Sequence, residues 1–312
     1  MKTFQILCIA ALIAQPLAVR AYDAHDTLAD FMVWFEANQT AQPQFVDGDL
    51  IEFDQVEMLR PFVPPGYQDE MFFAGMQVRV ADAGDLTPAD IYKTATERFS
   101  GQAVIAGDGA LQQYTASRPF DPATFTPDSA TDGFKLAWNF NYRWQNEGAE
   151  TGEAEWVWVR RGGVHTDHEI MKGNRARFYG GEGTFERVLR GPYKRIYLTH
   201  RSDLADQGYN VAGSWAEGVE FREYTGFDSP FDIAGTAFVI IRYEDPRKTD
   251  DAWAYIPSLR RISAEVKSDS LLGTDLTLED FYCFAGRVME WNWEYLGTAR
   301  MLAVAKSRSR EI

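Results

Sequence analysis

The side chains with the clearest potential for chemistry lie between Phe231 and Gly297, where arginines and aspartates are interspersed with apolar residues. Arg260 and Arg261 follow a predicted strand, residues 251–256, and a Pro-Ser turn. Neighbouring residues of a strand point to opposite faces, so one of the two guanidinium groups shares a face with apolar side chains. A charge there needs a carboxylate or an anionic ligand. We expect structural pairing; recognition of a ligand head group and simple exposure to solvent are the alternatives. The residues assigned to the polar mouth of a binding site, or to structural pins, are Asp232, Arg260, Arg261, Asp269, Asp275 and Asp280.

The sequence offers little for catalysis or metal binding. His165, Asp167 and His168 lie close together, but their spacing matches no common zinc pattern, and we interpret them as a loop cluster without metal. Cys283 falls in a short helix predicted to begin at Thr277, where we expect a buried, inert thiol. A nucleophile elbow, a phosphate-binding loop and a dinucleotide fingerprint are all absent from the sequence. We therefore predict that the protein is not an enzyme and uses no cofactor.

Aromatic residues are abundant, with 9 Trp, 14 Tyr and 21 Phe. Between residues 134 and 144 they occupy alternate positions, which favours a strand with one aromatic face, although the spacing also fits a helix. Alternation at residues 291–295 predicts a second such strand, and residues 251–256 carry two more aromatic side chains. These residues either fill the core or line a cavity for an apolar ligand. The candidate ligand-binding residues are Trp138, Phe140, Tyr142, Trp253, Tyr255, Trp291 and Trp293.

The remaining elements are predicted to form one mainly β domain with a few helices. Short helices are expected at residues 29–37 and from Thr87 onward, and prolines predict an extended segment at residues 59–67. Residues 102–115 read as a hairpin around Gly107-Asp108-Gly109. Short strands at even spacing indicate a single large antiparallel sheet or a barrel-like fold. These strands are predicted at residues 76–80, 156–158, 175–179, 187–189, 193–199, 219–225 and 236–243.

The first 21 residues read as a secretory signal peptide, with Lys2, an apolar run and small residues before the predicted cleavage after Ala21. Residues 22–312 would then form a single exported domain without a lipid anchor. Only Cys283 remains in that domain, so no intramolecular disulfide is expected. The net charge of −15 falls by two more when Lys2 and Arg20 are removed. This charge argues against nucleic acid and against an anionic membrane surface as partners.

Five motifs resemble the bacterial domain-of-unknown-function family 1329, which is related to carriers that sort outer-membrane lipoproteins. They are Leu59-Arg60-Pro61-Phe62-x-Pro64-Pro65-Gly66, Trp138-Asn139-Phe140-x-Tyr142, Phe231-Asp232-x-x-Gly235-Thr236, Asp251-x-Trp253-x-Tyr255-x-Pro257-x-Leu259-Arg260-Arg261, and Asp269-Ser270-x-x-Gly273-Thr274-Asp275-x-Thr277-x-Glu279-Asp280-Phe281. The motifs extend over nearly all of residues 22–312.

The resemblance implies a LolA/LolB-like fold, in which a large antiparallel sheet curls into an unclosed half barrel over helices and its concave side holds an acyl chain or a similar hydrophobe. It also implies the periplasm of a Gram-negative cell, an inner-membrane exporter of the resistance-nodulation-division type and an outer-membrane partner. Our leading hypothesis is a periplasmic carrier of a hydrophobic molecule or lipid. An outer-membrane lipoprotein chaperone is the alternative, and a hydrolase of an apolar substrate is a third.

Overall fold

The computed structural model describes residues 28–72, 76–83, 86–144, 148–161, 183–257, 261–264 and 284–303. These residues form two compact units. The smaller unit comprises the described residues up to 83 and from 298 to 303, and the larger unit lies within residues 86–297. In the part of the chain that the structure describes, every helix is too short or too polar to cross a membrane. The predicted signal peptide lies outside the described residues, and both it and the single binding domain stay predictions.

The smaller unit is built from short elements around a small apolar core. Its elements are α2 (Leu28–Asn38), β1 (Leu50–Glu52), η1 (Phe53–Met58), η2 (Arg60–Phe62), α3 (Pro65–Met71) and β2 (Gln77–Arg79), and β1 pairs antiparallel with β2. The core consists of the buried residues Ile51, Val56, Leu59, Met76 and Val80. The predicted helix at residues 29–37 and the strand near residues 76–80 are thus confirmed.

The prediction of an extended segment at residues 59–67 is wrong. Arg60–Phe62 forms a 3-10 turn, and Pro65 is the first residue of α3. A proline is tolerated at the first position of a helix because its missing N–H would have no partner inside the helix. The prolines therefore start helical turns here instead of preventing them.

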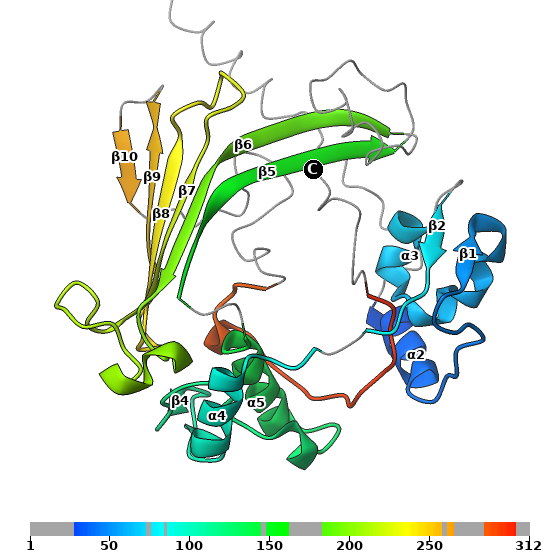
Figure 1. Cartoon of the computed structure of the whole chain (residues 1–312), viewed down its shortest axis with the longest axis horizontal. Coiled ribbons are helices and arrows are strands. Elements are labelled where there is room, and N and C mark those ends of the chain that lie inside the picture. Colours follow the sequence, from blue (N-terminus) through cyan, green and yellow to red (C-terminus); the bar gives the residue numbers. More distant parts are fainter. Residues whose placement is uncertain are drawn as a thin grey trace, which may run out of the picture. The chain divides into compact units, whose positions relative to one another are not determined.

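The larger unit contains a six-stranded sheet in which each strand pairs antiparallel with the next (Figure 1). Its strands are β5 (Ala149–Arg161), β6 (Gly183–Tyr197), β7 (Val219–Gly226), β8 (Ala237–Tyr243), β9 (Asp251–Ile256) and β10 (Arg261–Ala264). The long strands β5 and β6 bend along their length (Figure 1). The sheet is not closed into a barrel, because its order runs from β10 to β5 without pairing of those two strands. The mainly β, open antiparallel fold is confirmed, whereas the predicted strand at residues 175–179 lies outside the described residues.

The two faces of the sheet differ in burial. One face, called the inner face here, carries the buried residues Leu189, Phe238 and Ala254, packed with Phe227 and the half-buried Trp156 and Trp158. The strand register places Arg195 and Glu223 on the same face, as direct partners on β6 and β7. The opposite face includes the exposed side chains of Tyr224, Val239 and Tyr255. The inner face is therefore apolar along much of its length and charged toward the end of β6.

Helices and a hairpin pack at that charged end. The elements are α4 (Asp90–Phe99), β3 (Val104–Ile105), β4 (Leu111–Gln112), η3 (Pro122–Thr124), α5 (Ala130–Asn141), η6 (Ser202–Gln207) and η9 (Val288–Glu290). Their core contains Ala103, Phe120, Ala137, Trp138 and Val288. The hairpin is confirmed. Helix α4 begins at Asp90, later than predicted, and buries Tyr92 and Ala95 while Ile91 is exposed.

The strand predicted at residues 134–144 is wrong, and the helical alternative is confirmed by α5. The Ser129 side chain accepts a hydrogen bond from the Asp132 backbone N–H and so caps the helix. Phe134, Trp138 and Tyr142 are spaced four residues apart, which satisfies a period of two and a helical face equally well. All three contribute to the core around Trp138, so their burial against the hairpin decides the structure.

The aromatic strand predicted at residues 291–295 is also wrong. The 3-10 turn η9 comes directly before it, and Tyr295 forms an isolated bridge with Ser129. Trp293 packs on the α5 core and donates its Nε1–H to the Val288 carbonyl at 2.8 Å. Trp291 is 47% exposed. The alternating aromatic residues of this segment therefore have different surroundings and do not form one face of a strand.

Candidate functional site

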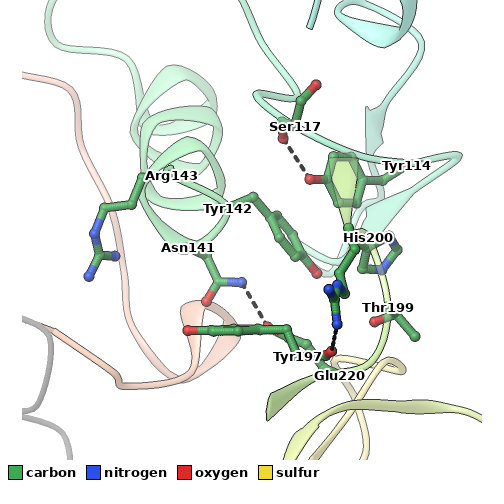
Figure 2. Close-up of a pocket in the computed structure, with 10 residues that line it drawn as sticks. Tyr114, Ser117, Asn141, Tyr142, Arg143, Tyr197, Thr199, His200 and Glu220 are labelled. Atoms are coloured by element: carbon green, nitrogen blue, oxygen red, sulfur yellow. Dashed lines mark hydrogen bonds between the residues drawn. The ribbon is translucent and has the colours of Figure 1, made fainter. Parts of the chain in front are cut away.

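Three adjoining hollows lie between the end of α5 and the charged end of the inner face, and Asn141 and Glu220 line all of them. The largest encloses about 420 Å³, part of it open to solvent. The other two each enclose about 280 Å³. Figure 2 shows the largest hollow with the aromatic rings, Asn141 and Glu220 gathered around it. This cluster of hollows is the candidate site.

Glu220 reaches the site because of a β-bulge. Val219 pairs with Tyr243 and Phe221 pairs with Arg242, so Glu220 is the extra residue of β7. Such bulges redirect a side chain that regular pairing would place elsewhere. The residue is 7% exposed, and its carboxylate accepts one long hydrogen bond, 3.4 Å from Asn141 Nδ2. Burial raises the pKa of Glu220, and the nearby Arg242 guanidinium opposes that rise.

Aromatic rings form one wall of the largest hollow. Tyr142 lies 4.3 Å from Tyr114 and 5.2 Å from His200 between ring centroids, and the Tyr114 and His200 rings are 4.6 Å apart. Burial raises the pKa of Tyr142 well above its usual value, and burial likewise raises the pKa of Tyr197. Both tyrosines therefore keep neutral phenol groups, whose ring faces carry partial negative charge.

His200 is held in a fixed orientation. Its backbone adopts a left-handed conformation with φ of 61°, and its Nδ1 lies 2.8 Å from the Thr115 carbonyl oxygen. A carbonyl can only accept, so Nδ1 carries the proton and Nε2 is unprotonated in the neutral ring. Burial lowers the pKa of His200, although Glu244 lies 3.7 Å from Nε2 and acts in the opposite sense. The imidazole is therefore neutral at pH 7.

The arginines around the site are matched by carboxylates. Arg195 forms a buried ion pair with Glu223, whose Oε2 also accepts a hydrogen bond from the Tyr193 hydroxyl. Arg242 and Arg287 both contact Asp250, and Arg287 also lies 3.4 Å from Glu290. Arg201 pairs with Asp203. Glu220, by contrast, has no ion pair within 4 Å among the residues the structure describes.

The structure places the sequence-predicted aromatic residues in different surroundings. Tyr142 lines the largest hollow, and the buried Trp138, which donates to the Gly109 carbonyl at 2.9 Å, lines one of the two smaller hollows. Phe140 is half-buried beneath the Arg143 guanidinium, 3.9 Å from the ring centroid. Trp253 and Tyr255 lie on the face opposite the buried Ala254. Together with exposed Trp291 and core-packed Trp293, these residues do not line one surface.

Most of the predicted polar residues cannot be placed. Asp232 is exposed in the loop after β7, and Arg261 is paired with Ile256 on β10. Arg260, Asp269, Asp275 and Asp280 lie outside the described residues, as do His165, Asp167, His168 and Cys283. Within the described ranges, no three His, Cys, Asp or Glu side chains cluster as metal ligands.

Glu220, His200 and the pair of Arg195 with Glu223 were not among the residues predicted from the sequence. One signal was present: charged residues occur at positions 220, 222 and 223, and so on both faces of a predicted strand. The bulge itself has no sequence marker, because the extra residue is recognised only from its partners on β8.

An open antiparallel sheet, with a helix and a hairpin packed at its charged end, defines the general class of this chain as a mainly β protein. The chain belongs to the family "Protein of unknown function (DUF1329)", which matches residues 74–311. The resemblance predicted from the motifs is thereby confirmed. No curated protein matches the chain.

Two solved structures are similar to parts of the chain. One is a DUF1329 family protein from Desulfovibrio piger ATCC 29098, with 17% identity over 54% of this chain and 55% of that chain, and a TM-score of 0.34. The other is described as a "putative outer membrane lipoprotein-sorting protein domain" from Vibrio parahaemolyticus. It is 19% identical over 53% of this chain and 52% of that chain, with a TM-score of 0.31. The match therefore spans about half the length of each solved structure.

Proposed function

We propose that the protein is a periplasmic carrier that holds a hydrophobic molecule, such as a lipid, against the inner face of its sheet. The observation that carries this proposal is the apolar strip on that face, where Trp156 and Trp158 remain half-buried beside the core residues Leu189 and Phe238. Half-buried tryptophans can give up further surface to a bound hydrocarbon, and such burial is favourable by about 25 cal/mol per Å².

The same proposal includes the cellular location of the protein and its partner proteins. The predicted signal peptide and the family resemblance support export to the periplasm and transport between membranes. An inner-membrane exporter and an outer-membrane protein would be the partners. A binding protein of this kind needs no catalytic residue, and none is assigned.

The first experiment asks what the protein carries. The protein is purified from the periplasm, extracted with organic solvent and analysed by mass spectrometry, and binding of an environment-sensitive lipophilic dye is measured in parallel. We expect a bound lipid or dye binding. A blank extract together with absent dye binding would refute the carrier. If crosslinking in cells trapped an acylated polypeptide, the protein would be a lipoprotein chaperone and not a carrier of a free hydrophobic molecule.

A matched pair of variants then identifies the face that binds. Trp156→Ala removes a ring from the inner face, and Trp253→Ala removes the same ring from the opposite face. We expect Trp156→Ala to weaken dye binding about tenfold and Trp253→Ala to leave it unchanged, with far-UV circular dichroism confirming that both variants fold. If Trp253→Ala weakens binding instead, the ligand occupies the opposite face and the inner-face proposal fails.

A further inference from the structure

We propose that the largest hollow, between α5 and the end of β6, is a binding site for a primary ammonium group of a small organic amine, recognised by Glu220 and Thr199. This site is separate from the apolar strip and does not depend on the carrier function. The two acceptors line the same hollow as the rings of Tyr114, Tyr142 and His200 (Figure 2).

The hollow contains acceptors with unused hydrogen-bonding capacity. An ionised carboxylate has about four acceptor positions, and the single hydrogen bond to Glu220 is 3.4 Å long. Thr199 is 6% exposed, and its buried hydroxyl has no hydrogen-bond partner among the described residues. Buried polar groups are nearly always satisfied, so the Thr199 hydroxyl beside a carboxylate with spare acceptor positions indicates a missing donor in the hollow. A primary ammonium supplies three N–H donors.

The charges around the hollow also bear on its ligand. Three arginines near Glu220 contact other carboxylates: Arg195 contacts Glu223, Arg242 and Arg287 share Asp250, and Arg287 also lies 3.4 Å from Glu290. Two further arginines line the hollow itself. Arg201 pairs with Asp203. Arg143 donates to the Phe140 carbonyl at 2.7 Å, and Figure 2 shows its side chain directed away from Tyr142.

Among the described residues the Glu220 carboxylate therefore lies outside these ion pairs, and Arg242 is its main electrostatic partner. A bound cation would balance this carboxylate, whereas a bound anion would add a second negative charge beside it.

The aromatic wall of the hollow also favours a cation. A cation placed against the faces of tyrosine rings is attracted by their negative potential, most strongly where water is excluded. Tyr142 and Tyr197 remain neutral phenols, and neutral His200 adds no repulsive charge. Carboxylate, hydroxyl and aromatic faces in one hollow are therefore complementary to an ammonium ion, and not to a carboxylate or phosphate.

Four small probes test the chemistry by isothermal titration calorimetry on the purified protein at neutral pH. Propylammonium has both charge and donors, tetramethylammonium has charge alone, butan-1-ol has neither the charge nor three donors, and propionate has the opposite charge. We expect propylammonium to bind about tenfold or more tightly than each of the other three. Equal or tighter binding of propionate would overturn the proposal, as would equal binding of tetramethylammonium or butan-1-ol.

Variants assign the site. Glu220→Gln keeps the shape of the side chain and should abolish the preference for propylammonium over butan-1-ol, whereas Glu217→Gln, on an exposed position of the preceding loop, should retain it. Thr199→Val should weaken propylammonium several-fold. Its control is Thr225→Val, which removes a hydroxyl that is likewise buried without a partner but lies outside the hollow. Unchanged affinity in folded Glu220→Gln and Thr199→Val would refute the assignment, and Thr199→Val tests it independently if Glu220→Gln does not fold.

Discussion

The buried ion pair between Arg195 and Glu223 gives the sharpest test of how the charged end of the sheet is held together. The Arg195 side chain is 5% exposed and the Glu223 side chain 2%. Arg195 Nε donates to Glu223 Oε2 at 2.7 Å, and its Nη1 donates to the Tyr197 hydroxyl at 2.9 Å. The guanidinium also lies 4.3 Å from the centroid of the Phe221 ring. We consider the variants Arg195→Met, Glu223→Leu and their combination.

The two single substitutions should each lower the free energy of unfolding strongly, and the double substitution should lower it only slightly. Arg195→Met leaves the Glu223 carboxylate buried with the Tyr193 hydroxyl as its described hydrogen-bond donor, and an unpaired buried charge costs about 3–5 kcal/mol. Glu223→Leu leaves the Arg195 guanidinium with Tyr197 and the Phe221 ring, so we expect a loss of about 2–4 kcal/mol. The double variant removes both charges and both desolvation penalties, and its stability should lie within about 2 kcal/mol of the native protein.

The assay is urea unfolding followed by tryptophan fluorescence and by circular dichroism, with urea chosen because it does not screen charge. Coincident transitions by the two probes are the control for two-state unfolding. A coupling free energy of about 3 kcal/mol or more between the two positions is expected from the cycle. Additive losses in the double variant, or a loss below about 1 kcal/mol for Arg195→Met, would show that the pair is not desolvated as its burial indicates.

Three further predictions concern neighbouring features. Burial raises the Glu220 pKa, so the stabilising contribution of this side chain is present below pH 4.5 and is lost as the pH rises through its folded-state pKa. Glu220→Gln should therefore be more stable than the native protein by about 1–3 kcal/mol at pH 8, with little difference at pH 4. Equal stability of the two proteins at pH 8 would contradict this. Burial lowers the His200 pKa, so the contribution of the neutral imidazole to protein stability is present above pH 6.5 and is lost as the pH falls. Asparagine tolerates the left-handed backbone at this position, and His200→Asn should therefore reduce the loss of thermal stability below pH 6.5. An unchanged pH profile of thermal stability would disprove this. Gly133→Ala in α5 would place a Cβ 2.5 Å from the Glu294 backbone nitrogen, and this clash should destabilise the protein by about 1–3 kcal/mol after the roughly 1 kcal/mol gain in helix propensity is subtracted. The control in urea unfolding is Gly152→Ala, which has no atom within 4 Å of the added Cβ. Equal stability of the two variants would refute the close contact.

The C-terminal part of the sheet could be predicted from the sequence because its strands are short and separated by turn residues. The predicted strands at residues 187–189 and 193–199 were wrong in their division, because residues 187–197 all belong to the single long strand β6. The strand at residues 219–225 and the one at residues 251–256 are within one residue of β7 and β9. These positions are set by local patterning and turn chemistry, which are properties of the sequence itself. The family resemblance was visible for a similar reason, since its motifs are local runs of residues.

The candidate site was not predictable, because its geometry depends on contacts between distant segments. Asn141 at the end of α5 approaches Glu220 only after the helix is correctly assigned, and the aromatic alternation favoured a strand there. The bulge that redirects Glu220 is defined by the partners of Val219 and Phe221 on β8. Aromatic residues were chosen by type, whereas packing determines whether a ring such as Trp138 fills the core or faces a hollow.

The pairing order of the sheet has a consequence for the time course of folding. Each strand from β5 to β10 pairs with the strand next to it in the sequence, and the connections become shorter toward the C-terminal end of the sheet. A short connection costs less chain entropy to close, so the hairpins β8–β9 and β9–β10 can form before the long strands β5 and β6 dock. The C-terminal hairpins would then serve as the template on which the curved strands are added. During synthesis β5, which bears Trp156 and Trp158, would consequently emerge first among these strands and pair last.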